Sequence, residues 1–103
     1  MLRVIILCAM GMSSSVITNA VRKAAEKRGI EIEIHCQPSL TMAEGDYTQA
    51  DVILMAPQIK GQKGEIEEYM KNYKAKLGSI DNLDYALAKG DNVLDQCLKL
   101  LEK

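Results

Sequence analysis

Two short apolar segments constrain what this chain can fold into more than any other feature. Arg3–Leu7 and Val52–Ala56 are apolar at nearly every position and rich in β-branched residues. This pattern is typical of strands that are buried on both faces of a sheet. A segment with a helical period follows each of them. Strands that alternate with helices predict a parallel sheet with helices packed on both faces.

The segments between these strands have recognisable periods. Val16–Arg28 repeats apolar residues every 3.6 positions and predicts a helix, with the serines at 13–15 as its N-cap and Gly29 at its C-terminal turn. Ile30–His35 alternates isoleucine with polar residues, which indicates an edge strand that Pro38 ends. A short helical turn is expected at Thr41–Gly45.

The second half of the chain predicts three more elements. A helix is expected from the spacing of Ile66, Tyr69, Met70, Tyr73 and Leu77, and a weaker fourth strand at Leu77–Asp81. Asp91 is expected to cap a last helix, whose inward side chains would be Val93, Leu94, Cys97, Leu98 and Leu101. The prediction is an α/β fold: one three-layer domain over residues 1–103, with a four-stranded parallel sheet flanked by helices.

Composition excludes several classes of function. The formal net charge is −1, from 13 basic and 14 acidic residues, which argues against a nucleic-acid-binding protein. The aromatic residues are four tyrosines, too few for a platform on which bases or sugar rings stack. No apolar stretch approaches the roughly 20 residues of a membrane span. The three cysteines are widely spaced and follow no secretion signal, so we expect reduced thiols and a cytoplasmic protein.

Cys8 is the residue best placed for chemistry. It ends the first predicted strand, and ligands in parallel sheets bind beyond the carboxyl ends of the strands. Backbone N–H groups of Ala9, Met10, Gly11, Met12, Ser13, Ser14 and Ser15, with the helix start behind them, can form an anion-binding nest. Such a nest stabilises a thiolate and equally a phosphate carried on sulfur. The alternative from chemistry alone is that Cys8 is a small core residue.

The spacing of this segment invites comparison with cysteine phosphatases, which carry Cys-x5-Arg. Here the sixth residue after Cys8 is Ser14, and the segment contains no arginine. The bidentate clamp for a transferring phosphoryl group is therefore missing. A site that accepts and passes on a phosphoryl group fits the residues better than a hydrolase does.

Other polar residues are weaker candidates. Gln58 and Lys60 follow the strand Val52–Ala56 and can reach the same sheet edge as Cys8, although an ordinary surface loop is the alternative for both. His35 is expected to be exposed, and Cys36 and Cys97 to belong to the core. No zinc-ligand spacing is present, so no metal site is predicted. Met10 and Met12 are candidates for the rim of a docking surface, with Lys60 at its edge.

The segment Val4–Ser15 resembles the start of the lactose/cellobiose-class IIB proteins of the bacterial phosphoenolpyruvate:sugar phosphotransferase system (PTS). The pattern Cys-x-x-Gly-Met-Ser-Ser-Ser from Cys8 to Ser15 carries this resemblance. Met55–Ile59, Asp84-Tyr85 and Gly90–Leu94 resemble later segments of the same family, so the similarity covers essentially the whole chain.

This resemblance implies a function. The cysteine matching Cys8 would accept a phosphoryl group from a phosphohistidine on a IIA protein and donate it to an oligosaccharide of the cellobiose, lactose or chitobiose type, which is bound by the membrane transporter IIC. The segment matching Ala9–Ser15 would hold the phosphate. From its position after the strand Val52–Ala56, Gln58 is a candidate for an outer contact of this site. No cofactor is expected. The implied fold is similar to that of low-molecular-weight tyrosine phosphatases. The alternatives are a cysteine-dependent phosphatase and a non-catalytic regulatory module of the same fold.

Overall fold

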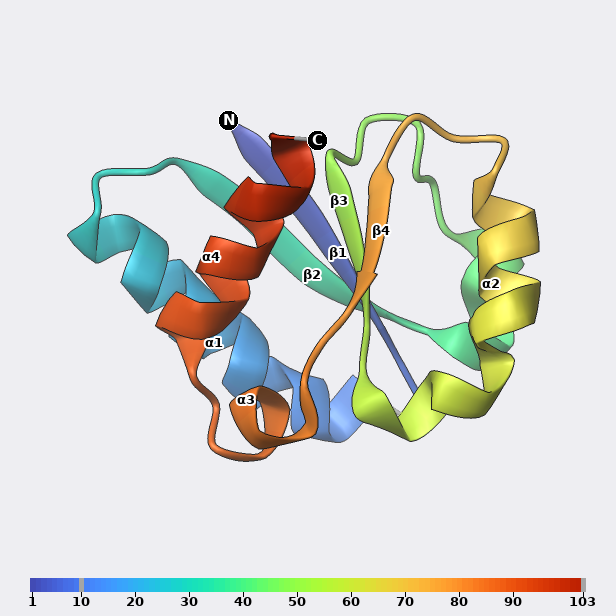
Figure 1. The fold of residues 1–103 in the computed structure, drawn as a ribbon, viewed down its shortest axis with the longest axis horizontal. Helices are drawn as coiled ribbons and strands as arrows, with labels where there is room; N and C mark the ends of the chain where they lie inside the picture. The colour runs from blue at the N-terminus through green and yellow to red at the C-terminus, as the bar shows by residue number, and fades with distance from the viewer. Residues whose placement is uncertain (10, 103) are drawn as a thin grey trace.

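The computed structural model describes the backbone of residues 1–9 and 11–102, and the side chains of these residues except 11–14. Strands and helices alternate along the chain (Figure 1). In chain order they are β1 (Leu2–Cys8), α1 (Gly11–Lys27), β2 (Ile32–Pro38), β3 (Val52–Met55), α2 (Lys63–Met70), β4 (Lys76–Ser79), α3 (Asn82–Ala86) and α4 (Gly90–Leu101). Two 3₁₀ segments, η1 (Ser39–Glu44) and η2 (Pro57–Gln62), follow β2 and β3.

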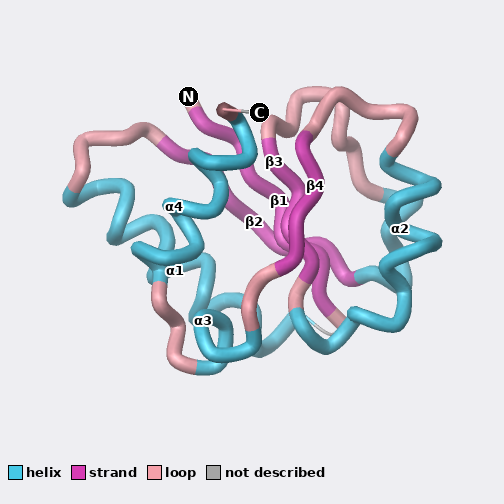
Figure 2. Tube along the Cα trace, in the orientation of Figure 1, coloured by secondary structure: helices cyan, strands magenta, loops and turns pink. Residues whose placement is uncertain are grey.

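The four strands form one parallel sheet in the order β2-β1-β3-β4 (Figure 2). Cys8 pairs in register with Pro38, Leu7 with Met55, and Met55 with Ser79. The carboxyl ends of all four strands therefore lie at one edge of the sheet, which we call the carboxyl edge. The predicted parallel sheet, its edge strand β2 and its weak fourth strand are confirmed.

Alternate residues of the strands feed two separate cores. Helices α1 and α4 cover one face, where Val4, Ile6 and Leu54 are buried. Helix α2 and the 3₁₀ segments cover the other face, where Ile5 and Leu7 are buried (Figure 1). Residues of β1 and β3 are buried on both faces, as their continuous apolar sequence predicts.

Helix α1 begins earlier than predicted, at Gly11 rather than Val16. The serines therefore belong to the helix and do not precede it as a loop. A serine inside a helix costs less than about 0.7 kcal/mol relative to alanine. The preference of serine for cap positions therefore does not determine where α1 begins. Ile17 and Val21 are buried as expected, but Val16 is exposed and lies off the buried stripe.

The predicted second helix is too long. Helix α2 ends at Met70, and Leu77 belongs to β4. Tyr73 and Leu77 nevertheless pack against the same core as Met70. The spacing looks helical although Tyr73 and Leu77 lie outside the helix. Tyr73 reaches the same core from a turn and Leu77 reaches it from a strand.

The last part of the chain contains two further corrections. Asp91 lies inside the first turn of α4 and does not cap it, and Leu101 is exposed. The short helix α3 was not predicted; the Asp81 carboxylate caps it by accepting a hydrogen bond from the backbone N–H of Leu83 at 3.0 Å. Helix α4 begins at Gly90, where α1 approaches closely: a Cβ on Gly90 would lie 2.2 Å from the carbonyl oxygen of Ala20 in α1.

Candidate functional site

Cys8 is the last residue of β1 and lies at the carboxyl edge, between the ends of β2 and β3. The backbone N–H of Ala56, just beyond β3, donates to the carbonyl of Leu7 at 2.8 Å, so the chain leaving β3 runs beside the cysteine. Only 1% of Cys8 is exposed. Its neighbours on both sides are fixed by the sheet, which holds the thiol at a defined place.

Helix α1 begins two residues after Ala9, which is itself exposed in a bend. The first four N–H groups of an α-helix have no acceptor within the helix, and its N-terminus carries a partial positive charge. The first turn of α1 contains no acidic residue that would compete for this charge. The end of β1 and the start of α1 together form a setting that favours an anion next to a cysteine sulfur.

The predicted phosphate-binding residues fall in three groups. Ala9 lies in the bend, and the backbone of residues 11–15 forms the start of α1. Ser15 is exposed, and its carbonyl accepts a hydrogen bond from the Thr18 hydroxyl at 3.0 Å. Met10 and the side chains of Met12, Ser13 and Ser14 lie outside the described part of the structure. The predicted loop is therefore mainly a helix N-terminus.

Gln58 and Lys60 lie in η2, directly after β3, and both are exposed. Gln58 lines a hollow of about 380 Å³ with Pro57, Asn82, Tyr85 and Ala86. Lys60 lines a different hollow. Both residues are at the carboxyl edge as expected, but the structure directs them towards α3 and α4.

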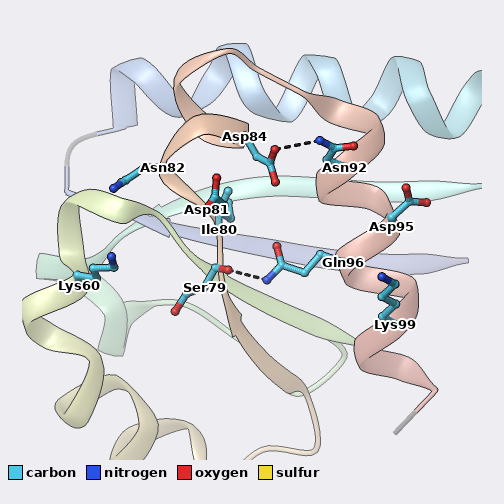
Figure 3. Close-up of a pocket in the computed structure, with 10 residues that line it drawn as sticks. All are labelled: Lys60, Ser79, Ile80, Asp81, Asn82, Asp84, Asn92, Asp95, Gln96 and Lys99. Atoms are coloured by element: carbon cyan, nitrogen blue, oxygen red, sulfur yellow. Dashed lines mark hydrogen bonds between the residues drawn. The ribbon is translucent and has the colours of Figure 1, made fainter.

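The hollow that Lys60 lines has a volume of about 570 Å³ and lies between η2, the end of β4 and α4 (Figure 3). Several of its polar groups already bind one another. Asn92 donates to Asp84 at 3.0 Å, and Gln96 donates to the carbonyl of Ser79 at 2.5 Å. At the rim, a hydrogen bond from Arg28 lowers the pKa of the Asp95 carboxyl. These contacts mainly tie β4, α3 and α4 together.

Helix α3 is the part of this region that sequence reasoning missed. Its Tyr85 packs against the core between α1 and α4, and its Asn82 lines both hollows. The signal was present in the sequence: Asp81, followed three residues later by Asp84, is close to the pattern of a helix N-terminus.

Cys97 and His35 are placed as predicted, whereas Cys36 packs against the core without being buried in it. Cys97 is fully buried in α4, and burial raises the pKa of its thiol to about 12. Cys36 is half-buried in β2, and His35 is exposed. Among the described residues, no group of three histidine, cysteine or carboxylate side chains is arranged to hold a metal ion. No helix within the described ranges is long and apolar enough to cross a membrane.

Three known proteins are similar to this chain over most of its length. The oligo-beta-mannoside-specific EIIB component of the PTS of Bacillus subtilis (strain 168) is 29% identical over 101 residues, which cover 98% of this chain and 97% of the relative. The lactose-specific EIICB component of Lacticaseibacillus casei is 28% identical over 101 residues, 89% of this chain but 16% of that longer protein. The lactose-specific IIB component domain from Streptococcus pneumoniae has the same fold, with a TM-score of 0.82, 20% identity and 95% coverage of both chains.

The sequence profile described as "PTS system, Lactose/Cellobiose specific IIB subunit" matches residues 3–96. This range includes Cys8, β2, β3 and β4, all of β1 except Leu2, and the first part of α4. The chain therefore belongs to the lactose/cellobiose-specific IIB family of the sugar phosphotransferase system.

Proposed function

We propose that Cys8 is the phosphoryl carrier of this IIB protein. The Cys8 thiolate attacks the phosphorus of a phosphohistidine on a IIA protein; the S–P bond forms, the N–P bond breaks, and the imidazole leaves. The hydroxyl of a sugar bound by IIC then attacks the same phosphorus: the O–P bond forms, the S–P bond breaks, the Cys8 thiolate leaves, and the hydroxyl proton passes to water. Membership of the IIB family supports this sequence of transfers.

The observation that carries the proposal is the position of Cys8 between the carboxyl end of β1 and the N-terminus of α1. We propose that backbone N–H groups of residues 9–15, including those of Ala9, Met10, Gly11, Met12, Ser13, Ser14 and Ser15, hold the phosphate. Four of these residues are in the first turn of α1, where N–H groups need external acceptors. Gln58 is proposed as an outer contact, because it follows the strand that lies beside Cys8.

The sugar class and the partners are inferred from the relatives. The names of the two curated relatives specify oligo-beta-mannoside and lactose, which supports an oligosaccharide as the final acceptor. The L. casei relative combines C and B components in one name and is much longer than its matched segment, which supports IIC as the partner of the second transfer. We propose the cytoplasm as the site of the reaction, because that is where a phosphohistidine donor of the IIA type would act.

Hydrolysis is expected to be slow at this site. Phosphatases of this architecture stabilise the transferring group with an arginine six residues after the cysteine, where this chain has Ser14. Backbone N–H groups alone bind the bound phosphate and the transition state about equally, and such uniform binding does not accelerate chemistry. The phosphorylated protein should therefore keep its phosphate until a protein partner returns.

The proposed function can be tested by phosphorylating the protein and then removing the phosphoryl donor. The protein would be incubated with phosphoenolpyruvate, the general phosphotransferase proteins and a lactose/cellobiose-class IIA, then purified and followed by intact mass. We expect the gain of one phosphoryl group, slow loss in buffer, and rapid loss when unphosphorylated IIA is added. Absence of any mass gain would indicate a non-catalytic module. Rapid loss without an acceptor, or turnover of p-nitrophenyl phosphate, would indicate a phosphatase.

A further inference from the structure

The backbone of β4 is open on its outer side. In a parallel sheet, the residues of a strand turn their N–H and C=O groups alternately towards one side of the strand and the other. The N–H of Lys76 donates to the carbonyl of Asp51 at 3.0 Å. Lys76 and Gly78 therefore face β3, whereas Leu77 and Ser79 face away from the sheet. In the described part of the chain, no hydrogen-bond partner meets the N–H or C=O of Leu77 or the N–H of Ser79.

The other edge of the sheet is protected by a charged side chain. In β2, the outward-facing carbonyl of Ile34 accepts a hydrogen bond from Arg22 of α1 at 2.6 Å. Charged side chains placed in this way keep an edge strand from pairing with another chain. On β4 the comparable contact comes from Gln96 of α4, which donates to the carbonyl of Ser79. It leaves Leu77, in the middle of the edge, available to a new strand.

Two adjoining hollows, of about 520 and 370 Å³, lie along this open edge between β4 and α2. The apolar side chains that line them are Met55, Met70, Tyr73, Ala75 and Leu77. Glu67 and Leu77 line both hollows, which therefore follow one another along the strand. The charges on the α2 rim are already paired, Lys63 with Glu67 at 3.9 Å and Lys71 with Glu68 at 3.0 Å. Figure 1 shows α2 on this side of β4 and α4 on the other.

We propose that this groove binds an extended peptide segment of another protein, which pairs with β4 as a fifth strand of the sheet. The N–H and C=O of Leu77 exchange hydrogen bonds with the backbone of the segment, as in other cases of strand addition. Side chains of a strand alternate between its two faces. Two side chains that are two positions apart therefore reach the two hollows, whose lining favours apolar residues.

The residue between these two apolar positions faces α4. Leu77 packs on the α2 side, so its neighbours Lys76 and Gly78 are on the α4 side. A Cβ on Gly78 would indeed meet side chains of α4, at 2.8 Å from Leu100 and 3.3 Å from Gln96. Lys76 is exposed there, and within the described ranges no carboxylate forms an ion pair with it. An acidic residue at the middle position is therefore favoured, and the ligand is an apolar–acidic–apolar segment.

A second copy of this chain fits the groove less well than such a segment. Two β4 edges would pair about a two-fold axis at Leu77. Glu67, which lines both hollows beside Leu77, would then lie close to the same residue of the copy, and like charges at this distance are unfavourable. A segment without a flanking helix has no such conflict.

The test measures binding of synthetic peptides of about seven residues with a central Val-Glu-Val, Val-Glu-Leu or Leu-Glu-Val, and of a Val-Lys-Val counterpart. They would be titrated into isotope-labelled protein while the amide signals are followed by NMR. Gly64→Leu fills the first hollow from a position where a Cβ meets nothing within 4 Å. Ser79→Pro removes an outward N–H at an edge, where proline is tolerated. Gly61→Leu is the matched control, since its Cβ is equally unobstructed and Gly61 lines neither hollow.

We expect saturable shifts centred on Leu77 and Ser79, with Kd below about 1 mM for at least one acidic peptide and weaker binding of Val-Lys-Val. Kd should rise at least about fivefold in Gly64→Leu and Ser79→Pro and stay within about twofold in Gly61→Leu, with circular dichroism verifying each fold. Absence of saturable binding, shifts centred on α1, or a Gly64→Leu protein that binds like Gly61→Leu would overturn the proposal. A dimer in sedimentation that Ser79→Pro dissociates and the peptides do not would assign the edge to a second copy instead.

The groove and the cysteine are independent in this test. Cys8→Ser should bind the peptides as the wild type does, and Gly64→Leu should still accept a phosphoryl group. Peptide binding that is lost in Cys8→Ser would overturn the groove. A wild type that binds peptides but accepts no phosphate would overturn the proposed function and leave the groove intact.

Discussion

Two helix ends in this protein use the same backbone turn with different residues at its left-handed position. Gly29 follows α1 with φ = 69°, and Ala88 follows α3 with φ = 49°. The N–H of Ile30 then donates to Ala25, and the N–H of Lys89 to Asp84, which closes each helix in the same way. A left-handed φ is strained for alanine but not for glycine.

These two positions make a matched pair of predictions with opposite sign. Gly29→Ala should lower the free energy of unfolding by about 1 kcal/mol, and Ala88→Gly should raise it by up to about 0.5 kcal/mol. The gain is smaller because Ala88 also packs against the core. Urea unfolding of both variants measures the effect. Changes of the same sign at both sites would show that φ does not govern these turns.

The burial of Cys97 predicts a pH dependence of stability. Burial raises the pKa of its thiol from 9.0 to about 12, so above pH 9 the unfolded state loses a proton that the folded state keeps. Stability should therefore fall as pH rises from about 9 towards 12, by at most about 1.4 kcal/mol per pH unit from this group. Cys97→Ser removes the group, so its stability deficit relative to wild type should shrink between pH 8 and pH 10. A deficit that stays constant in urea titrations under reducing conditions would contradict this.

At the scale of elements, the contact between α1 and α4 depends on Gly90. A Cβ there would lie 2.2 Å from the carbonyl oxygen of Ala20 and 2.8 Å from the nitrogen of Val21. Because these are backbone atoms, relief requires the helices to separate. Gly90→Ala should lower the free energy of unfolding by about 2–3 kcal/mol or more.

The control for this prediction is Gly64→Ala in α2, where a Cβ would meet nothing within 4 Å. This change should be neutral or stabilise the protein by up to about 0.5–1 kcal/mol, because alanine favours a helix. Thermal and urea unfolding would compare the two variants. A Gly90→Ala protein as stable as Gly64→Ala would mean that α1 and α4 do not approach this closely.

The sequence predicts the strands of this protein better than it predicts where the helices begin. The strands were found because β1 and β3 are buried on both faces and carry continuous apolar runs. The starts of α1 and α4 were misplaced because the cap preferences of serine and aspartate, worth about 1 kcal/mol, do not by themselves fix where a helix begins. Helix α3 was missed because its five residues have no apolar period to detect.

For the whole molecule, the position of the candidate site was predictable and its surroundings were not. Cys8 at the carboxyl edge follows from strand order alone, since parallel strands end together. The directions of Gln58 and Lys60 do not, because they depend on how η2 and α3 pack at this edge.

The near-neutral charge of the molecule predicts how donor encounter responds to salt. With 13 basic and 14 acidic residues, long-range steering contributes little. Raising the ionic strength from about 0.01 M to about 1 M, which shortens the Debye length from about 30 to 3 Å, should change KM for phosphorylated IIA by less than about threefold. A fall of affinity by a factor of ten or more would indicate that charged contacts dominate docking.

The most direct test of the central claim is the identity of the phosphorylated thiol. Wild type, Cys8→Ser and Cys36→Ser would each be incubated with phosphoenolpyruvate, the general phosphotransferase proteins and IIA, and analysed by intact mass and peptide mapping. The account predicts one phosphoryl group on Cys8 in the wild type and in Cys36→Ser, and none on cysteine in Cys8→Ser. Phosphate on Cys36, Cys97 or His35, or full phosphorylation of Cys8→Ser at one of these residues, would contradict it.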